Sequence, residues 1–349
     1  FIMAYTTINK SADYFNTKLY TGNSSVRTLT GVGMQPDWVW IKDRNNARDH
    51  MLFDAVRGAT KDIRTNATDV ESTIADTLTA FTSDGFSLGA DSTAASALVN
   101  GNSNSYVSWN WKANGQGSAN NDGSTNTTYT SANTTAGISI VKWTPSGSAE
   151  TVGHGLGAVP KMIITKNLGA SQGWFTYHHS IGNTKYLRVD STNGEATDAN
   201  AWNNTTPTSS VFSVGSQFGG SAYVAYCFAE KKGFSRFGKY VGNANGSDNA
   251  FVYCGFKPAY VMTKNSTQNG DRWTVYDDKR DVRNPTYLRL FPDGSLVESA
   301  NTDADIDLLS NGFKIRTDAG TSGAAQTYIY MAFAKAPLVG SNNTPATAR

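Results

Sequence analysis

The chain has 349 residues, with 30 basic and 28 acidic side chains, a formal net charge of +2 and 17% charged residues. Thr, Ser, Asn and Gly supply 40, 33, 31 and 33 residues, and aromatic residues make up 11%. Thr and aromatic residues favour strands, while Asn, Ser and Gly favour turns, so the composition predicts a β-rich protein and argues against a helical bundle. The chain is nearly neutral and has no clusters of basic residues, which argues against binding to nucleic acid or to an anionic membrane surface.

Two further classes of protein are excluded by local patterns. No stretch approaches about 18 consecutive apolar residues, so we expect no membrane insertion, and the opening residues lack the pattern of a secretory signal. The two cysteines, Cys227 and Cys254, are too few for a disulfide scaffold and lack the spacing of a zinc site. We expect two buried thiols, and a disulfide between them stays open as the alternative.

A set of strand-like landmarks recurs three times in the same order. A segment that begins with proline appears as Pro36–Lys42, Pro160–Lys166 and Pro258–Lys264. A closing segment rich in aromatic residues follows as Tyr106–Trp111, Tyr223–Phe228 and Tyr328–Phe333. From the last lysine of the first segment to the tyrosine of the second, the separations are 64, 57 and 64 residues. This regularity indicates an internal repeat of about 100 residues, the size of a β-sandwich domain.

The repeats define the domain organisation in chain order. The fold class that we predict is all-β, with three tandem β-sandwich or jelly-roll-like (lectin-like) repeats. The predicted parts are an N-terminal extension (1–14), repeat 1 (15–113), an Asn/Ser/Thr/Gly-rich linker (114–137), repeat 2 (138–230), repeat 3 (234–336) and a polar C-terminal tail (337–349).

The closing segments also predict which side chains form the core. Side chains alternate along a strand, so the large residues of each closing segment share one face. We expect them to be buried at equivalent positions: Trp109 and Trp111, Tyr226 and Phe228, and Met331 and Phe333. The segments that begin with proline are apolar on both faces, which predicts an interior position in a layered structure.

Several of these segments resemble a repetitive family of virion structural or tail-fibre-type proteins from tailed bacteriophages, including phages of marine bacteria and cyanobacteria. The resemblance is carried by Gln35–Lys42, Arg48–His50, Leu52–Lys61, Ser83–Phe86, Val152–Gly157, Tyr226–Ala229 and Leu309–Lys314. It implies a non-enzymatic component of a tail fibre or appendage, assembled in the host cytoplasm and extracellular in the mature virion. A host receptor- or glycan-binding module, a capsid decoration protein and a glycan hydrolase are the alternatives.

The expected partners follow from this resemblance and from the low charge. We expect homo-oligomers, with a trimer favoured, and contacts with other virion proteins. A host surface glycan is a further candidate partner. We also expect at least one of the two polar termini to pack on another subunit or on another virion protein.

Candidate chemistry is sparse in the sequence. Asp303, Asp305 and Asp307 alternate as in calcium loops, but Leu308 and Lys314 stand where such a loop needs glycine and glutamate, so a solvated turn is favoured. We expect adjacent His178 and His179 to point to opposite faces of a strand, and His154 to lie in a turn. The sequence therefore indicates no catalytic, cofactor-binding or metal-binding residue and no cofactor, and it identifies no ligand-binding residue.

Overall fold

The computed structural model of the chain describes residues 6–92, 98–245, 249–300, 305–317 and 321–337. These residues form antiparallel β-sheets with one 3-10 turn, η1 (Ser11–Asp13), and one short helix, α1 (Ala199–Trp202). The predicted all-β class is confirmed. Within the described ranges, no helix is long and apolar enough to cross a membrane.

The first unit consists of a six-stranded sheet, in the order β1-β9-β3-β4-β5-β6, and a three-stranded sheet, in the order β2-β8-β7. Its strands are β1 (Phe15–Thr21), β2 (Arg27–Leu29), β3 (Trp38–Asp43), β4 (Met51–Asp54), β5 (Gly58–Arg64), β6 (Ser72–Thr73), β7 (Leu78–Thr82), β8 (Gly85–Leu88) and β9 (Ser105–Trp111). An apolar core lies between the two sheets.

The second unit has a seven-stranded sheet, in the order β10-β11-β18-β13-β14-β15-β16, and a two-stranded sheet, β12-β17, beside α1. Its strands are β10 (Tyr129–Asn133), β11 (Ile138–Trp143), β12 (Glu150–Gly153), β13 (Met162–Asn167), β14 (Phe175–His178), β15 (Lys185–Arg188), β16 (Ala196–Thr197), β17 (Val211–Val214) and β18 (Tyr223–Phe228).

The third unit has a four-stranded sheet, in the order β19-β25-β21-β22, and a three-stranded sheet, in the order β20-β24-β23. Its strands are β19 (Ser235–Val241), β20 (Phe251–Tyr253), β21 (Phe256–Asn265), β22 (Thr274–Asp277), β23 (Ile306–Leu309), β24 (Gly312–Ile315) and β25 (Thr327–Pro337).

The large sheets of the three units share the order of four strands and differ beyond them. The closing strand (β9, β18 or β25) lies between β1, β11 or β19 on one side and the strand of the proline-led segment (β3, β13 or β21) on the other, and β4, β14 or β22 follows. The registers also correspond, because Trp40 pairs with Trp109, Ile164 with Tyr226, and Met262 with Met331. The six large side chains predicted to be buried are at most 1% exposed, which confirms the predicted core face.

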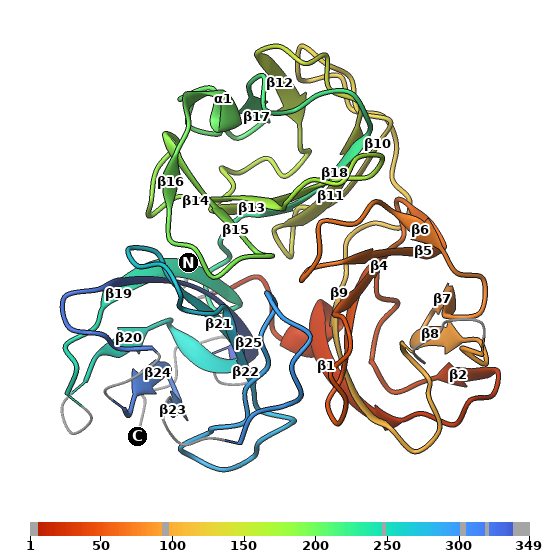
Figure 1. Cartoon of the computed structure of the whole chain (residues 1–349), viewed down its shortest axis with the longest axis vertical. Helices are drawn as coiled ribbons and strands as arrows, with labels where there is room; N and C mark the ends of the chain where they lie inside the picture. The colour runs from red at the N-terminus through yellow and green to blue at the C-terminus, as the bar shows by residue number, and fades with distance from the viewer. Residues whose placement is uncertain (1–5, 93–97, 246–248, 301–304, 318–320, 338–349) are drawn as a thin grey trace, which may run out of the picture.

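The three units surround one central core. Figure 1 shows them as three lobes about a common centre, with the large sheets turned inward. Each large sheet directs one face toward its own small sheet and the other face into this centre, where aromatic and aliphatic side chains of all three units meet. The large sheets are therefore buried on both faces, which explains why β3 and β13 carry buried residues throughout.

The predicted linker needs a correction, because part of it is a strand of the second unit. Its β10 pairs with β11 from Tyr129 opposite Lys142 to Asn133 opposite Ile138, and Thr125 forms a bridge to Val152 of β12. The segment lacks the alternation of apolar residues that marks a strand, so composition alone suggested a linker. Thr and Ser nevertheless fit an edge strand, where a half-solvated surface suffices.

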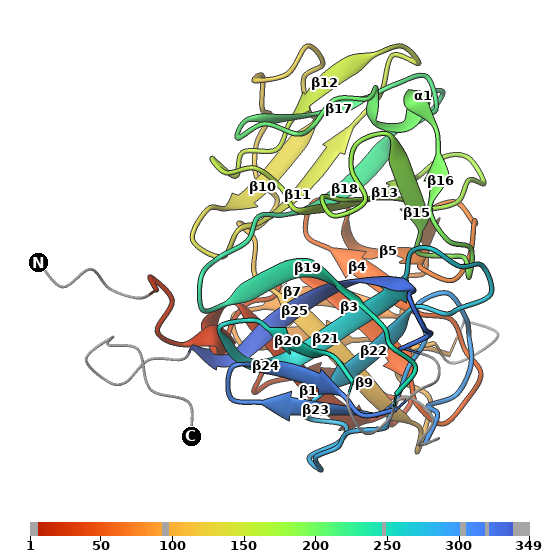
Figure 2. The same ribbon diagram turned by 90° about the vertical axis from the view of Figure 1, so that its left-hand side faces the viewer.

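The first described residues, which precede β1, pack against the central core and the third unit. Ile8 is 1% exposed in the central core, and η1 packs against β25 of the third unit. In Figure 2, β1 and the end of β25 lie on the same side of the molecule. Residues 1–5 and 338–349 lie outside the described residues, so contact of a terminus with another subunit stays a prediction.

Candidate functional site

The three junctions between units use the same pair of hydrogen bonds. At each junction, the backbone N–H of a glutamate donates to a carbonyl of the next unit: Glu71 to Leu168 (3.0 Å), Glu195 to Ser266 (2.7 Å) and Glu298 to Arg44 (2.9 Å). A lysine Nζ donates in the opposite direction: Lys166 to the Thr68 carbonyl (2.9 Å), Lys264 to Thr192 (3.0 Å) and Lys42 to Ser295 (3.3 Å). The third junction joins the last unit to the first, so the ring of units is closed.

The three junction lysines are buried charges. Lys42, Lys166 and Lys264 have 0% exposure, and burial lowers the pKa of each to about 8. Each Nζ also donates to at least one backbone carbonyl of its own unit, such as that of Asp43, Gln172 or Asp271. The carbonyl oxygens accept from two or three N–H groups of each ammonium group and oppose the effect of burial.

These lysines should make the free energy of unfolding rise between about pH 8 and pH 10. In that window the unfolded chain, with ordinary lysine pKa values, binds more protons than the folded chain, so higher pH favours folding. We expect about 2 to 3 kcal/mol per lysine, because each unit of pKa difference corresponds to about 1.4 kcal/mol. Denaturant unfolding at several pH values measures this slope. The variant Lys166→Met should reduce it and exposed Lys257→Met should not; equal slopes in all three proteins would contradict the prediction.

Two buried acid–arginine pairs also connect units. Asp54 accepts from Arg57 Nε at 2.5 Å and from Tyr226 Oη of the second unit at 2.7 Å. Asp277 accepts from Arg280 Nε at 2.5 Å and from Trp109 Nε1 of the first unit at 2.9 Å. Both carboxylates are fully buried, so each depends on its arginine and on a donor from the neighbouring unit.

The equivalent position of the second unit carries different residues. His178 replaces the aspartate and Ile181 replaces the arginine. Met331, which offers no N–H or O–H donor, occupies the position equivalent to Tyr226 and Trp109. Nε2 of His178 lies 3.3 Å from the Tyr330 carbonyl oxygen, and burial lowers its pKa to about 3. A neutral imidazole therefore stands where the other junctions hold a charged pair.

The predicted metal candidates do not gather in the described chain. Asp303 lies outside the described residues, Asp305 is buried, and Asp307 in β23 pairs with Arg316 at 3.3 Å. Within the described ranges, no group of three or more His, Cys, Asp or Glu side chains could hold a metal ion.

The predicted orientation of the adjacent histidines was wrong. Strand β14 ends at His178, so alternation does not extend to His179, and the two rings lie 5.1 Å apart. His154, in contrast, follows the end of β12 in a turn, as expected, and its Nδ1 accepts from the Leu156 backbone N–H. Cys227 and Cys254 are both buried and unpaired with each other, so the predicted thiols are present and the alternative disulfide is not.

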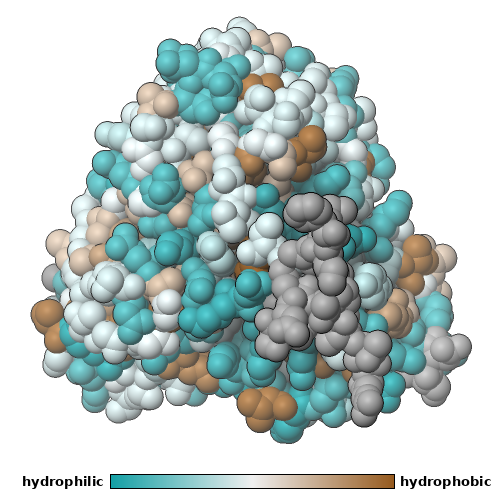
Figure 3. Space-filling model, turned by 180° about the vertical axis from the view of Figure 1, so that it is seen from behind, coloured by the Kyte–Doolittle hydropathy of each residue, from teal (hydrophilic) through white to brown (hydrophobic). Residues whose placement is uncertain are grey.

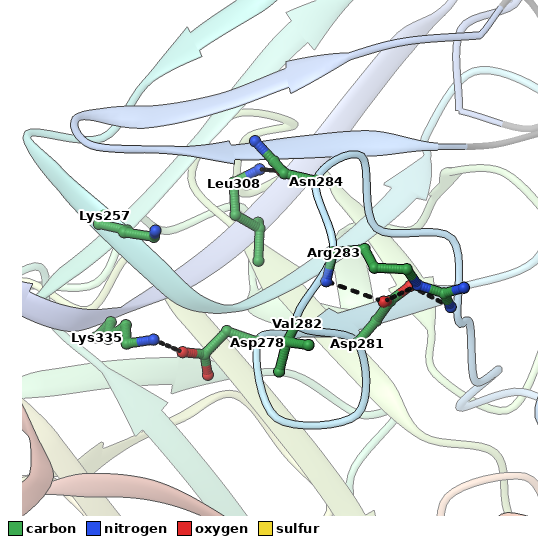
Figure 4. Close-up of a pocket in the computed structure, with 8 residues that line it drawn as sticks. All are labelled: Lys257, Asp278, Asp281, Val282, Arg283, Asn284, Leu308 and Lys335. Atoms are coloured by element: carbon green, nitrogen blue, oxygen red, sulfur yellow. Dashed lines mark hydrogen bonds and ion pairs between the residues drawn. The ribbon is translucent and has the colours of Figure 1, made fainter. Parts of the chain in front are cut away.

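One cavity, of about 110 Å³, is lined mostly by charged side chains of the third unit (Figure 4). Its wall consists of Lys257, Asp278, Asp281, Val282, Arg283, Asn284, Leu308 and Lys335. Lys335 lies 2.7 Å from Asp278, and Arg283 lies 2.8 Å from Asp281, so the two carboxylates are already neutralised. The cavity has room for a few water molecules, and its charged groups pair along the wall.

A larger open groove of about 440 Å³ lies between the edge strands β19 and β20 of the third unit. It is lined by His179, Ser180, Arg236–Tyr240, Phe251–Tyr253 and Tyr330. A second hollow of about 480 Å³ adjoins it, lined by Glu230, Lys232, Gly233, Ser235, Arg236 and Tyr253–Gly255. Arg236 and Tyr253 belong to both walls, so the two hollows meet at these side chains.

The groove combines exposed aromatic rings with charged groups. Phe251 and Tyr253 are 46% and 54% exposed, and within the described ranges they are the aromatic side chains with the greatest exposure. Arg236 pairs with Glu230 at 2.7 Å, while Lys239 is exposed on β19. We take this groove as the candidate functional site, because open pockets with a few polar groups and aromatic walls are the usual form of a ligand site.

Sequence reasoning missed both the junctions and the groove, although part of each signal was present. The junctions repeat a Thr/Ser residue three positions before glutamate: Thr68 and Glu71, Thr192 and Glu195, Ser295 and Glu298. The groove is marked by Phe251 and Tyr253 on a short strand, but their exposure depends on what covers that strand.

Comparison with known proteins gives one match. A family model described as a domain of unknown function (DUF7483) matches residues 10–337. No curated protein and no solved structure matches the chain.

Proposed function

We propose that this chain, which belongs to the DUF7483 family of domains of unknown function, is a non-catalytic structural protein of a bacteriophage virion, as a component of a tail fibre or appendage. The observation that carries the proposal is that the buried charged groups bond one unit to the next. The junction lysines and the acid–arginine pairs connect units to each other. Groups in such environments often perform chemistry, but here they contribute to a closed architecture.

The surface agrees with a role in a particle. Figure 3 shows apolar residues in small separate patches on a mostly hydrophilic face. We propose other copies of the chain and other virion proteins as partners, with a homotrimer as the favoured state. The aromatic faces of the closing strands are covered within the chain, so contacts between copies would use other surfaces.

A second candidate function is binding to a host surface glycan or receptor, which the aromatic groove of the third unit favours. Capsid decoration and glycan hydrolysis are less favoured. Release of reducing sugar from a host polysaccharide by the purified chain would favour the hydrolase over a structural role.

Antibodies against the purified chain, applied to phage particles in immunogold electron microscopy, test the proposal. We expect label on the tail or its appendages and a copy number per particle that fits tail symmetry. Label over the capsid with an icosahedral copy number would favour decoration instead. Absence of the chain from purified particles would overturn the virion assignment.

A further inference from the structure

The groove between β19 and β20 is open because, in the described part of the chain, no segment covers the third unit as one covers the second. In the second unit, β10 pairs along β11, and residues 120–125 lie over β12. The chain between the second and third units is too short to provide such a cover, since β18 ends at Phe228 and β19 begins at Ser235. Among the described residues, no other segment takes that place over the equivalent strands β19 and β20.

The side chains on the open strand also differ between units. Val252, Leu29 and Val152 occupy equivalent positions, because each pairs with the phenylalanine of the facing strand. The residues that flank them are Phe251 and Tyr253 in the third unit, Thr28 and Thr30 in the first, and Thr151 and Gly153 in the second. The third unit alone has aromatic rings there, so the fold does not require them.

The open edge of β19 is already protected against an added strand. The Phe237 backbone N–H donates to Glu230 Oε2 at 3.4 Å, and Nε2 of His179 lies 3.2 Å from the Phe237 carbonyl oxygen. In the second unit, the equivalent Ile140 instead pairs with Ser131 of β10. Side chains that occupy the outward backbone groups are a common protection of sheet edges, and they disfavour a peptide as the occupant.

The charges of the two hollows favour an anion. Their walls carry Arg236, Lys239 and Lys232 against one carboxylate, Glu230. Exposed aromatic rings have a negative face that attracts the C–H groups on the apolar face of a sugar ring, and the tyrosine hydroxyl offers a hydrogen bond. We propose that this groove binds an acidic oligosaccharide, with sugar rings on Phe251 and Tyr253 and a sugar carboxylate near Lys239 or Lys232.

This inference goes beyond a structural role and does not depend on it, because binding is measured on the purified chain and virion assignment on particles. Isothermal titration of the full chain with oligogalacturonate, oligomannuronate and oligosialate tests it. We expect at least one of these probes to bind, more weakly at high salt, and about tenfold more weakly after its carboxylates are esterified.

The variants Phe251→Thr and Tyr253→Thr copy the first unit, so they should fold with an unchanged melting temperature. We expect Tyr253→Thr to weaken binding about tenfold. The matched control Thr30→Ala in the first unit should leave affinity unchanged.

Four results would overturn the proposal. Three concern the sugars: no binding of any acidic probe at millimolar concentration, equal binding of the esterified probe, and full binding by the double variant Phe251→Thr/Tyr253→Thr. A synthetic peptide of residues 114–137 that bound the wild-type chain in place of the sugars, and lost affinity with Tyr253→Thr, would identify a polypeptide occupant and would also overturn it.

Discussion

Replacement of Arg280 by methionine should lower the free energy of unfolding by about 3 to 5 kcal/mol, because it leaves Asp277 charged and buried without its cation. Arg280 donates to Asp277 Oδ2, to the Val275 carbonyl oxygen at 2.8 Å and to Glu298 at 3.0 Å. Burial acts to lower the pKa of Arg280, but Asp277 and Glu298 outweigh it and raise the pKa overall. Denaturant unfolding of the wild-type chain and the variant measures the loss.

The second unit supplies a matched rescue for this variant. At the equivalent positions it carries His178, Ile181 and, from the neighbouring unit, Met331. The triple variant Asp277→His/Arg280→Ile/Trp109→Met copies this arrangement without a buried charge. It should be more stable than Arg280→Met alone at neutral pH. A loss below about 1 kcal/mol for Arg280→Met would show that the pair contributes little to stability.

Truncation of Trp111 to alanine should lower the free energy of unfolding by about 3 to 5 kcal/mol, since it removes a large ring from the point where units meet. Trp111 is fully buried, and its ring stacks on Trp38 at 4.2 Å and contacts Tyr260 and Phe333 of the third unit at 5.7 Å. The cavity would therefore open between the first and third units.

Thermal and denaturant unfolding, followed by tryptophan fluorescence, measures this effect. Val282→Ala is the control, because Val282 is 87% exposed and a surface truncation should change stability by less than about 0.5 kcal/mol. A Trp111→Ala protein as stable as this control would contradict the assignment of Trp111 to the shared core.

The sequence predicted what is encoded locally. Apolar residues on both faces of Trp38–Asp43, and large residues on one face of Ser105–Trp111, are visible as patterns of adjacent residues, and both strands were found. The strand β10 was missed because Thr, Ser and Asn give no apolar alternation. The position of β10 depends on its pairing with the edge of β11, which a local pattern does not reveal.

The junctions could not be predicted from local patterns, because they connect residues far apart in the chain. Lys42 and Ser295 are separated by 253 positions, and only closure of the ring brings them together. The groove depends on the same kind of information. Phe251 and Tyr253 are residue types that are common in core strands, and their exposure arises because none of the other described segments covers β20.

Closure of the ring within one chain has a consequence for stoichiometry. An assembly of three identical subunits would show every substitution three times, so its surface would be threefold symmetric. Here the three units share a backbone plan but vary independently, as the exchange of Asp277 for His178 and of Thr30 for Tyr253 illustrates. A feature such as an aromatic groove can therefore occur once per molecule, in one unit and not in the other two. The number of grooves on a particle then depends on how many molecules the particle displays.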